Sequence, residues 1–571
     1  MLVPLAVWIL ISGLDDVFVS LCWIGIRKAT HVPTRAEREA MPERRIAILI
    51  ALWQEHAVTG QMLERTVSTM QYSNYDIFVG VYPNDERTVR AVSEAASHHE
   101  RIQVAMLPHA GPTSKGDCLN WTFRRMCEFE EQNGVRYEVI VTHDAEDVVH
   151  PESLHLINWF SRDYAMVQIP VLALPTPELE ITHGLYCDEF AEYQLKDIPV
   201  RQALGGFLPS NGVGCGFERA ALERLADSRD GKIFDPTALT EDYENGFQFH
   251  AMGYRQIFVP VRFENGAPMA TREYFPRTRR AAARQRSRWI AGIALQGWER
   301  HGWRVSWRQR YWFWRDRKGL VGNLLSPVAN VAYLYGLLDW RATANMPHWA
   351  AALYTSTLGI TLLQVGMRVW TGSRIYGWQF AALSPLRVFW GNWVNFLATS
   401  KALWQFGGAR LRGVTLRWHK TEHCYPTHSI STAGRPRLGE VLVRMRCAEM
   451  RDIEAALQSM PAGARLGEYL VKLHKLSEDE VYQALSTQSG IPFGAPGEAD
   501  VNRAAARTLP AELRKRWHVL PYRVVMGQLH MVTTEAPSEE MIRELGAATK
   551  LDLRFRLAQP AAFERLVELV K

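Results

Sequence analysis

The sequence predicts an α/β protein with a mostly parallel sheet and flanking helices, joined to transmembrane helices and to a C-terminal α+β domain with a helical repeat. Between Arg45 and about Pro276, β-branched runs alternate with amphipathic helical segments, which is typical of βαβ units. Apolar segments long enough to cross a bilayer lie on both sides of this region. A repeat follows in the C-terminal part, with copies starting at Arg437 and Arg465.

The α/β domain is assigned to residues 45–300. Parallel strands need long crossover connections, and the helical segments between the apolar runs can supply them. Strands are predicted at 46–52, 77–82, 104–107 and 138–142, and helices at 59–70 and 88–98.

Composition limits the function classes. The 571 residues carry a net charge of only +6, which gives no general attraction to a nucleic acid polymer. The basic residues cluster at 272–288 and 304–318, beside apolar helices, where we expect them to face anionic lipid or to mark cytoplasmic flanks. The seven cysteines show no CxxC spacing, so we expect reduced thiols in a cytosolic setting and no zinc site.

An N-terminal anchor is predicted at residues 3–26 and assigned as the domain 1–30. Asp15 and Asp16 lie in its middle, where carboxylates in lipid are costly. They must therefore face protein or water, or the segment lies partly in the interface. The basic run 27–45 places that side of the membrane in the cytoplasm.

The second membrane region, 301–406, is expected to contain two more spans and an interfacial helix. The spans are predicted at 319–340 and 346–370. The segment 385–405 is apolar but carries several polar residues, Arg387 among them, so we expect an amphipathic helix in the interface. Three spans return the chain to the cytoplasm.

The C-terminal part begins with a polar linker at 407–431, followed by a domain at 432–571. The repeat predicts two related helical hairpins, each too small to bury its own apolar face. Strands are expected near 519–525 and 529–533.

Three carboxylates, Asp144, Glu146 and Asp147, follow the strand predicted at 138–142. Open α/β sheets bind ligands at the carboxyl ends of their strands. Acidic side chains at i and i+2 can hold a hard divalent cation and leave positions open for substrate phosphates. The alternative is a solvated acidic loop.

Further polar residues stand at equivalent places. Glu55 follows the first strand and Asp85 follows the second, while Lys115 and Asn120 are placed to meet phosphate or ribose oxygens. The GxxxxGK[ST] spacing of a P-loop is absent, so an ATPase is disfavoured.

Two motifs further along the chain contain additional candidate catalytic residues. In Thr240-Glu-Asp242, the last carboxylate could act as general base on an acceptor hydroxyl, although such a triplet also starts helices. Gln285-Arg-Ser-Arg288-Trp289 is expected to open an interfacial helix, with Trp289 stacking on a sugar and Arg288 meeting a diphosphate. The alternative for this motif is an amphipathic surface.

On these motifs, residues 45–420 resemble the membrane-embedded family 2 glycosyltransferases, the class that contains cellulose and hyaluronan synthases. Asp144-Ala-Glu146 is similar to the family's DxD, Thr240-Glu-Asp242 to its TED, and Gln285-x-x-Arg288-Trp289 to its QxxRW. The resemblance implies a GT-A fold, a nucleotide-sugar donor that is usually a UDP-sugar, Mn²⁺ or Mg²⁺, and inversion at the anomeric carbon.

The resemblance also implies residue roles. Asp242 is the implied catalytic base. The other implied catalytic residues are Glu241, Gln285, Arg288 and Trp289. The nucleotide-sugar is bound by Glu55, Asp85, Lys115 and Asp144, and the metal by Asp144 and Glu146. Residues 211–217 correspond to a small-residue loop near the acceptor. Glu146 replaces the family's second Asp, so either it or Asp147 holds the metal, and no gating-loop motif of the cellulose synthase type follows QxxRW.

The part from about Arg435 resembles the MshE N-terminal domain, a cyclic di-GMP receptor. Its RLG motif starts both repeat copies, and Gln488 ends the second, although Met460 stands where the first should end in Gln. Each Arg-Leu-Gly start could form an anion site at a helix N-terminus, while the alternative is a helical adaptor without ligand. The resemblance implies binding of cyclic di-GMP, as an allosteric activator, by Arg437, Leu438, Gly439, Arg465, Leu466, Gly467 and Gln488.

The combination of both domains is similar to that of NfrB-type inner-membrane proteins, known as the membrane subunit of a bacteriophage receptor. That resemblance implies a bacterial inner-membrane enzyme with cytoplasmic catalytic and sensor domains. It also implies a polysaccharide acceptor that becomes an exopolysaccharide, and an outer-membrane secretion partner. Two alternatives remain: a catalytically weak scaffold of an envelope export or phage-uptake complex, and a transferase acting on a lipid-linked sugar.

Overall fold

The computed structural model describes residues 2–26, 30–264, 267–338, 346–414, 425 and 438–570, apart from 446, 462–463, 490, 498–499, 526–527 and 550. The chain forms two compact units. The first comprises Met1–Phe263 and Pro268–Tyr425, and the second comprises Glu264–Ala267 and Pro426–Lys571.

A seven-stranded sheet forms the core of the first unit. Its neighbouring strands are parallel, except that β7 runs antiparallel to both β4 and β5, which confirms a mostly parallel sheet. The strand order is β3 (Ile102–Met106), β2 (Tyr75–Val81), β1 (Ile46–Ala51), β4 (Val139–His143), β7 (Cys215–Glu218), β5 (Met166–Gln168), β8 (Gln256–Phe258).

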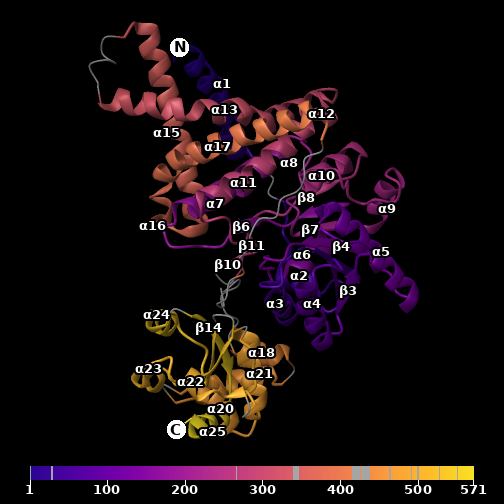
Figure 1. Cartoon of the computed structure of the whole chain (residues 1–571), viewed down its shortest axis with the longest axis vertical. Helices are drawn as coiled ribbons and strands as arrows, with labels where there is room; N and C mark the ends of the chain where they lie inside the picture. The colour runs from indigo at the N-terminus through magenta and orange to yellow at the C-terminus, as the bar shows by residue number, and fades with distance from the viewer. Residues whose placement is uncertain are drawn as a thin grey trace. The chain divides into compact units, whose positions relative to one another are not determined.

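Helices cover this sheet, as the alternating pattern predicted (Figure 1). The four predicted strands and both predicted helices are present, with ends shifted by no more than a few residues. The apolar strand residues are almost fully buried because helices cover the sheet, as in other α/β folds. The helices are α2 (Arg35–Glu39), α3 (Thr59–Thr69), α4 (Glu86–His98), α5 (Lys115–Asn133), α6 (Ser153–Phe160), α8 (Ile198–Ala203), α9 (Arg219–Asp227) and α10 (Glu241–Ala251).

One short ribbon and a second group of helices complete the unit, and a second ribbon is divided between the two units. β6 (Val171–Ala173) pairs with β11 (Thr271–Glu273), and β9 (Phe263–Glu264) pairs with β10 (Ala267–Pro268). The helices are α1 (Leu2–Gly25), α7 (Ile181–Glu192), α11 (Arg279–Trp289), α12 (Gly297–His301), α13 (Trp307–Leu338), α15 (His348–Tyr376), α16 (Trp378–Ala381) and α17 (Ser384–Leu411), with π-helical segments η1 (Tyr193–Asp197) and η2 (Ile290–Gln296).

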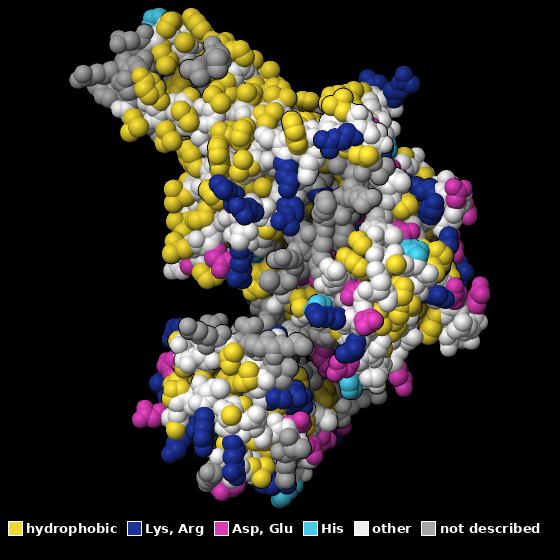
Figure 2. All heavy atoms as spheres, in the orientation of Figure 1, with side chains coloured by type: hydrophobic (Ala, Val, Ile, Leu, Met, Phe, Trp, Pro, Cys, Tyr) yellow, Lys and Arg dark blue, Asp and Glu magenta, His cyan; other side chains and the backbone are white. Residues whose placement is uncertain are grey.

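Two helices, Val3–Gly25 and His348–Tyr376, are long and apolar enough to cross a membrane. They gather with α13 at one end of the unit, and hydrophobic side chains dominate the surface there (Figures 1 and 2). The predicted span 319–340 falls on α13 and partly outside the described residues, so it stays a prediction. Of the alternatives left open for Asp15 and Asp16, the structure favours contact with protein, because both contact Lys318 of α13.

The helix α17 differs from its prediction in one respect. One of the polar residues that suggested an interfacial helix is covered by protein, and the others are half-buried. Arg387 is fully buried, with its Nε 2.6 Å from Asp188 Oδ2 on α7, and Asn395 Oδ1 accepts a 2.8 Å hydrogen bond from Arg286. The apolar side chains of Leu386 and Trp404 are exposed instead. Arg387 therefore does not face water, and the interfacial location of this helix stays a prediction.

The second unit contains the two predicted hairpins, α18 (Leu438–Arg444) with α19 (Met450–Ser459), and α20 (Leu466–Lys472) with α21 (Glu478–Ser489). They share one hydrophobic core, as expected of hairpins too small to bury their own faces. A Cβ on Gly439 would lie 2.5 Å from Ile453, and one on Gly467 would lie 2.7 Å from Val481. The repeated glycine therefore allows equivalent close packing within each copy.

A three-stranded sheet follows the hairpins, in the order β12 (Val519–Val525), β13 (Gln528–Thr533), β14 (Asp552–Leu557). The first two strands confirm their predictions, and β14 was not predicted. Its helices are α22 (Arg503–Ala506), α23 (Ala511–Arg516), α24 (Glu539–Ala548) and α25 (Pro560–Val570).

Candidate active site

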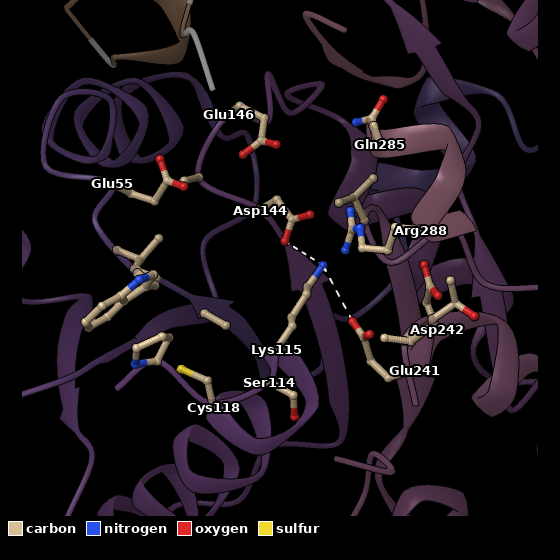
Figure 3. A pocket seen from close by; sticks show the side chains of 18 of the residues that line it. Glu55, Ser114, Lys115, Cys118, Asp144, Glu146, Glu241, Asp242, Gln285 and Arg288 are labelled. Atoms are coloured by element: carbon tan, nitrogen blue, oxygen red, sulfur yellow. Dashed lines mark ion pairs between the residues drawn. The ribbon is translucent and has the colours of Figure 1, made fainter. Parts of the chain in front are cut away.

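A cavity opens where β1 and β4 end, as the position of the acidic residues predicted. It holds about 1040 Å³ of space not filled by protein atoms, including its open mouth. Its lining includes most of the predicted transferase residues: Glu55, Lys115, Asp144, Glu146, Glu241, Asp242, Gln285, Arg288 and Trp289. Figure 3 shows Glu55 on one side, Gln285 and Arg288 on the other, and Lys115 between them.

Lys115 connects the two acidic motifs. It is the first residue of α5, whose start is capped by the Ser114 side chain. Its Nζ lies 2.6 Å from Asp144 Oδ1 and 4.0 Å from Glu241 Oε1. Burial alone lowers the pKa of Lys115, but the carboxylates of Asp144, Glu241 and Asp242 outweigh it and the pKa is raised. The cavity therefore contains a fixed positive charge.

The loop after β4 separates the two candidates for the second metal ligand. Asp147 is fully buried, with Oδ2 2.7 Å from His143 Nδ1 and 3.0 Å from the Asp144 backbone nitrogen. It holds the loop from inside and does not line the cavity in the described structure, whereas Asp144 and Glu146 do. The cavity therefore offers Glu146, and not Asp147, beside Asp144.

These two carboxylates fit a Mn²⁺ or Mg²⁺ site in the chemistry of their donors. Magnesium usually binds one or two carboxylates and takes its other ligands from water and substrate phosphates. Among the described residues, no group of three His, Cys, Asp or Glu side chains could enclose a metal ion. Asp144 and Glu146 would thus hold the ion together with the donor's diphosphate.

Glu241 and Asp242 begin α10. Asp242 Oδ1 accepts a 2.7 Å hydrogen bond from the Tyr243 backbone N–H. Gly212, at φ +79°, makes room for this carboxylate, since a Cβ there would lie 2.8 Å from Asp242 Oδ2. Burial, with the charge of Asp242, raises the pKa of Glu241 to about 7, and burial also raises the pKa of Asp242. The pair therefore holds protons more tightly than ordinary carboxyl groups do.

The QxxRW motif closes α11 instead of opening a helix, so that expectation is wrong. The helix begins at Arg279, and after Trp289 the backbone widens into the π-helical segment η2. Trp289 packs edge-on against Tyr186, with ring centroids 6.1 Å apart. Gln285 Oε1 is buried and has no hydrogen-bond partner within the described structure. This end of the helix points its polar groups toward the cavity (Figure 3).

Two predicted contacts have other roles in the structure. Asp85 does not line the cavity in the described structure; it caps α4 and accepts a hydrogen bond from the Gln54 backbone N–H, at a left-handed residue with φ 56°. It thereby fixes the turn before Glu55. Asn120 both donates to and accepts from the Phe234 backbone, at 2.9 Å each, so the expectation that it meets phosphate or ribose is wrong.

Two aromatic residues of the cavity were not predicted. Trp53 and Tyr82 line it together, with ring centroids 5.3 Å apart in an edge-to-face arrangement. Tyr82 Oη lies 2.7 Å from Thr113 Oγ1, also in the lining. Both aromatics lie within two residues of the end of a strand, and an aromatic residue at a strand's carboxyl end is the signal that could have found them.

The predicted cyclic di-GMP residues lie on the second unit. A Cβ on Gly467 would lie 3.2 Å from Leu438, and one on Gly439 would lie 3.5 Å from Leu466. The glycine of each motif therefore packs against the leucine of the other motif. Arg465 Nη1 lies 2.6 Å from Glu535 Oε1, and both side chains are more than half exposed. Gln488 lies on α21, and Arg437 lies outside the described residues.

Two family models match the sequence. The model described as glycosyltransferase like family 2 matches residues 42–292. The model described as MshEN domain matches residues 489–570. The second match begins after both repeat copies, so it does not include the predicted ligand residues between 437 and 488.

Two relatives from Escherichia coli each share 34% identity over 566 residues, which covers 92% of this chain and 75% of the relative. They are bacteriophage adsorption protein B of strain K12 and bacteriophage N4 adsorption protein B of O157:H7. Among solved structures, a mannosyltransferase from Pyrobaculum calidifontis in complex with GDP-Man and Mn²⁺ is 16% identical, at a TM-score of 0.44 over 68% of this chain and 99% of its own. MshE with cdg is 25% identical, at a TM-score of 0.21 over 24% of this chain and 96% of its own.

Proposed function

The chain belongs to the family of bacteriophage adsorption protein B and is a family 2 glycosyltransferase, and we propose that it transfers a sugar from a UDP-sugar to a growing exopolysaccharide with inversion. One observation carries this proposal. Lys115 bridges the metal-binding motif at Asp144 and the base motif at Glu241 within a single cavity. A donor and an acceptor can thus be held side by side.

The proposed reaction is a single displacement. The Asp242 carboxylate takes the proton of an acceptor hydroxyl, whose oxygen attacks the anomeric carbon as the bond to the diphosphate breaks. The nucleoside diphosphate leaves with the bonding electron pair. Lys115 and Arg288 lie in the cavity lining and would stabilise the charge that develops on the leaving group. Attack opposite the leaving group inverts the anomeric configuration.

A Mn²⁺ or Mg²⁺ ion held by Asp144 and Glu146 would neutralise part of the diphosphate charge. Gln285 supplies an unused buried acceptor, because its Oε1 has no hydrogen-bond partner within the described structure. A buried unpaired acceptor is unfavourable, so a hydroxyl of the sugar at this place would satisfy it. Trp289, on the same helix end, offers an apolar ring for the sugar.

We place the protein in a bacterial inner membrane, with the glycosyltransferase domain and the C-terminal sensor domain in the cytoplasm. Two helices with the length and composition of membrane spans support this location, together with the exposed apolar surface around them (Figure 2). In this location we expect the protein to interact with membrane lipid, with the polysaccharide acceptor and with an outer-membrane secretion partner. A role in bacteriophage adsorption follows from the names of the relatives.

Cyclic di-GMP is proposed as the allosteric activator. The crossed contacts of Leu438 with Gly467 and of Leu466 with Gly439 relate the two repeat copies as a pair, which suits a dinucleotide with two equivalent halves. The exposed guanidinium of Arg465 can form charge-assisted hydrogen bonds with a phosphate. The activator can shift the enzyme only by binding one of its states more tightly.

The direct experiment is a screen of nucleotide-sugars for release of nucleoside diphosphate by the full chain in membranes, with and without cyclic di-GMP. We expect release from one UDP-sugar, increased by cyclic di-GMP and lost in Asp242→Asn. Release that persists unchanged in Asp242→Asn would overturn the proposed chemistry, and no release from any donor would favour the scaffold.

A further inference from the structure

One turn of α13, residues 315–318, contacts both the start of the catalytic helix α10 and the middle of the membrane helix α1. Asp316 makes the first contact, whereas Arg315 and Lys318 make the second. We call these four residues the α13 turn. No other described segment pairs with both Tyr243 and Asp15 in the hydrogen bonds and ion pairs of the structure.

The contact with α10 is a buried network around Asp316. Its Oδ2 accepts a 2.7 Å hydrogen bond from Tyr243 Oη. Arg201 donates to both carboxylate oxygens, at 2.8 and 3.0 Å, and its Nε donates to the Phe207 carbonyl. A bidentate pair of this kind fixes both distance and orientation. Asp316 therefore holds Tyr243 against α13.

Tyr243 in turn holds the proposed base. Its backbone N–H donates the 2.7 Å hydrogen bond to Asp242 Oδ1, and its ring packs edge-to-face on Phe207 at 5.4 Å. Phe313, one helical turn before Asp316, belongs to the same buried cluster. The first turn of α10, which aims Asp242 into the cavity, is thus anchored on α13.

The contact with α1 is a cluster of charged side chains. Lys318 Nζ lies 2.9 Å from Asp15 Oδ2 and 2.7 Å from Asp16 Oδ1. Arg315 pairs with Asp15 and lies 3.2 Å from Asp16. Asp15 also accepts a 2.7 Å hydrogen bond from Tyr311 Oη. The side chain of Asp15 is only 6% exposed, so these partners replace water.

The same cluster continues through η1. Arg315 lies 3.8 Å from Asp197, Asp197 lies 3.6 Å from Lys196, and Lys196 pairs with Glu192, which also pairs with Arg368 of α15. The carboxylates number four and the cations four, so the cluster is neutral: Asp15, Asp16, Glu192, Asp197; Lys196, Arg315, Lys318, Arg368. Buried charges need their partners, so sliding or rotation of α1 would leave several of them unpaired.

We propose that Asp316 is a positioning residue for Asp242, and that α1, through Asp15 and Asp16, fixes the α13 turn that carries it. The inference rests on the proposed role of Asp242 as base. The N-terminal helix is then a part of the transferase itself, beyond its use as an anchor. The path runs from Asp15 through the α13 turn and Tyr243 to the reacting group.

The first test measures sugar transfer by the full chain in membranes for Tyr243→Phe and Asp316→Asn. Tyr243→Phe removes one oxygen, so it should fold, and it should lower kcat roughly tenfold, while Asp316→Asn should lower it by about 10- to 100-fold, as expected for small misplacements. KM for the donor should change less than twofold. The double variant should be no slower than Asp316→Asn, because the two residues act as one unit.

A matched control distinguishes positioning from general destabilisation. Glu130→Gln breaks another buried ion pair of the same unit, with Arg219 at 3.1 Å, and neither residue forms a hydrogen bond or ion pair with α10 or α13 within the described structure. It should lower Tm without this loss of kcat. If Tyr243→Phe and Asp316→Asn keep the kcat of the parent while Asp242→Asn loses it, the positioning role is wrong and the proposed base stands.

The second test concerns α1. Asp15→Asn with Asp16→Asn should reduce kcat at least several-fold with donor KM retained, and Ile11→Ala, on an exposed side chain of the same helix, should not. Nucleoside diphosphate binding by calorimetry gives the fraction of folded protein, so a loss of kcat per binding site reports positioning. Full kcat per binding site in the double Asp→Asn variant would overturn the role of α1.

Discussion

Lys115 Nζ lies 2.6 Å from Asp144 Oδ1, in a cavity where the carboxylates of Glu241 and Asp242 also act on this lysine. The ion pair joins the helix α5, at its first residue, to the loop after β4. A negative diphosphate entering this cavity would meet a positive charge already in place. In the proposed mechanism, a metal ion shares Asp144 with this lysine.

The metal prediction is that Asp144→Ala abolishes sugar transfer and that EDTA does the same to the parent protein. The reason is that the charge on the departing diphosphate needs a cation beyond Lys115 in the transition state. Transfer is measured as nucleoside diphosphate release before and after chelation, with Mn²⁺ or Mg²⁺ added back as control. Undiminished transfer in EDTA would contradict the prediction.

Replacement of Glu146 should change the metal requirement of the enzyme, whereas replacement of Asp147 should change the stability of the fold. Glu146→Gln should raise the Mn²⁺ concentration needed for half-maximal activity at least tenfold and leave Tm nearly unchanged, because Glu146 faces the cavity. Asp147→Asn should destabilise the fold by about 1–3 kcal/mol, since it disturbs buried hydrogen bonds. Metal titrations and thermal unfolding check both halves. The reverse pattern would make Asp147 the ligand.

Glu241 should make stability depend on pH. Its pKa is raised to about 7 from an ordinary value of 4.5, chiefly by burial. The folded protein therefore holds this proton where the unfolded chain has lost it, and stability falls as pH rises between these two values. Glu241→Gln cannot titrate, so its Tm relative to the parent should increase from pH 5 to pH 8.

The control for this prediction is Glu128→Gln, an exposed carboxylate on α5. Its Tm difference from the parent should show little change over the same range. A Tm difference for Glu241→Gln that is equally constant with pH would show that the folded protein does not raise this pKa.

Much of the fold and the site could be predicted because their signals are local. Acidic residues after β1 and β4 had to meet, since the carboxyl ends of neighbouring parallel strands share one edge of the sheet. Even β14, which was missed, carries a local signal: Leu553, Phe555 and Leu557 alternate with Arg554 and Arg556.

The features that could not be predicted depend on contacts between residues far apart in the chain. Nothing near Asn120 indicates that it binds the Phe234 backbone, and nothing near Asp15 identifies Lys318 as its partner. Asp147 was indistinguishable from Glu146 as a ligand because the turn that buries it closes on His143. Periodicity specifies which residues share a face, and only the packed structure specifies what covers that face.

For the second unit, we predict that Arg465→Ala weakens cyclic di-GMP binding by about 10- to 100-fold, the effect of a lost charge-assisted contact. The activating concentration should rise by the same factor, with maximal activity retained. Binding by calorimetry and activity titrations are compared on the full chain. A variant that binds cyclic di-GMP as the parent does would place the ligand elsewhere.

Glu535 competes for the same guanidinium, because its Oε1 lies 2.6 Å from Arg465 Nη1. Glu535→Gln should therefore tighten cyclic di-GMP binding, by no more than about fivefold because exposed pairs contribute only about 0.2–1 kcal/mol. Glu468→Gln is the control, since its contact with Arg465 is longer, at 3.9 Å. Weaker binding in Glu535→Gln would mean that Glu535 contacts the ligand.

The central claim is that Asp242 is the base of a sugar transfer in this cavity. The measurement is nucleoside diphosphate release by the full chain in membranes, with donor binding measured on the same preparation, for the parent and for Asp242→Asn. We expect the variant to bind the donor like the parent but to transfer sugar roughly 10²–10⁴-fold more slowly. An equal loss of donor affinity, or transfer at the parent's rate, would contradict it.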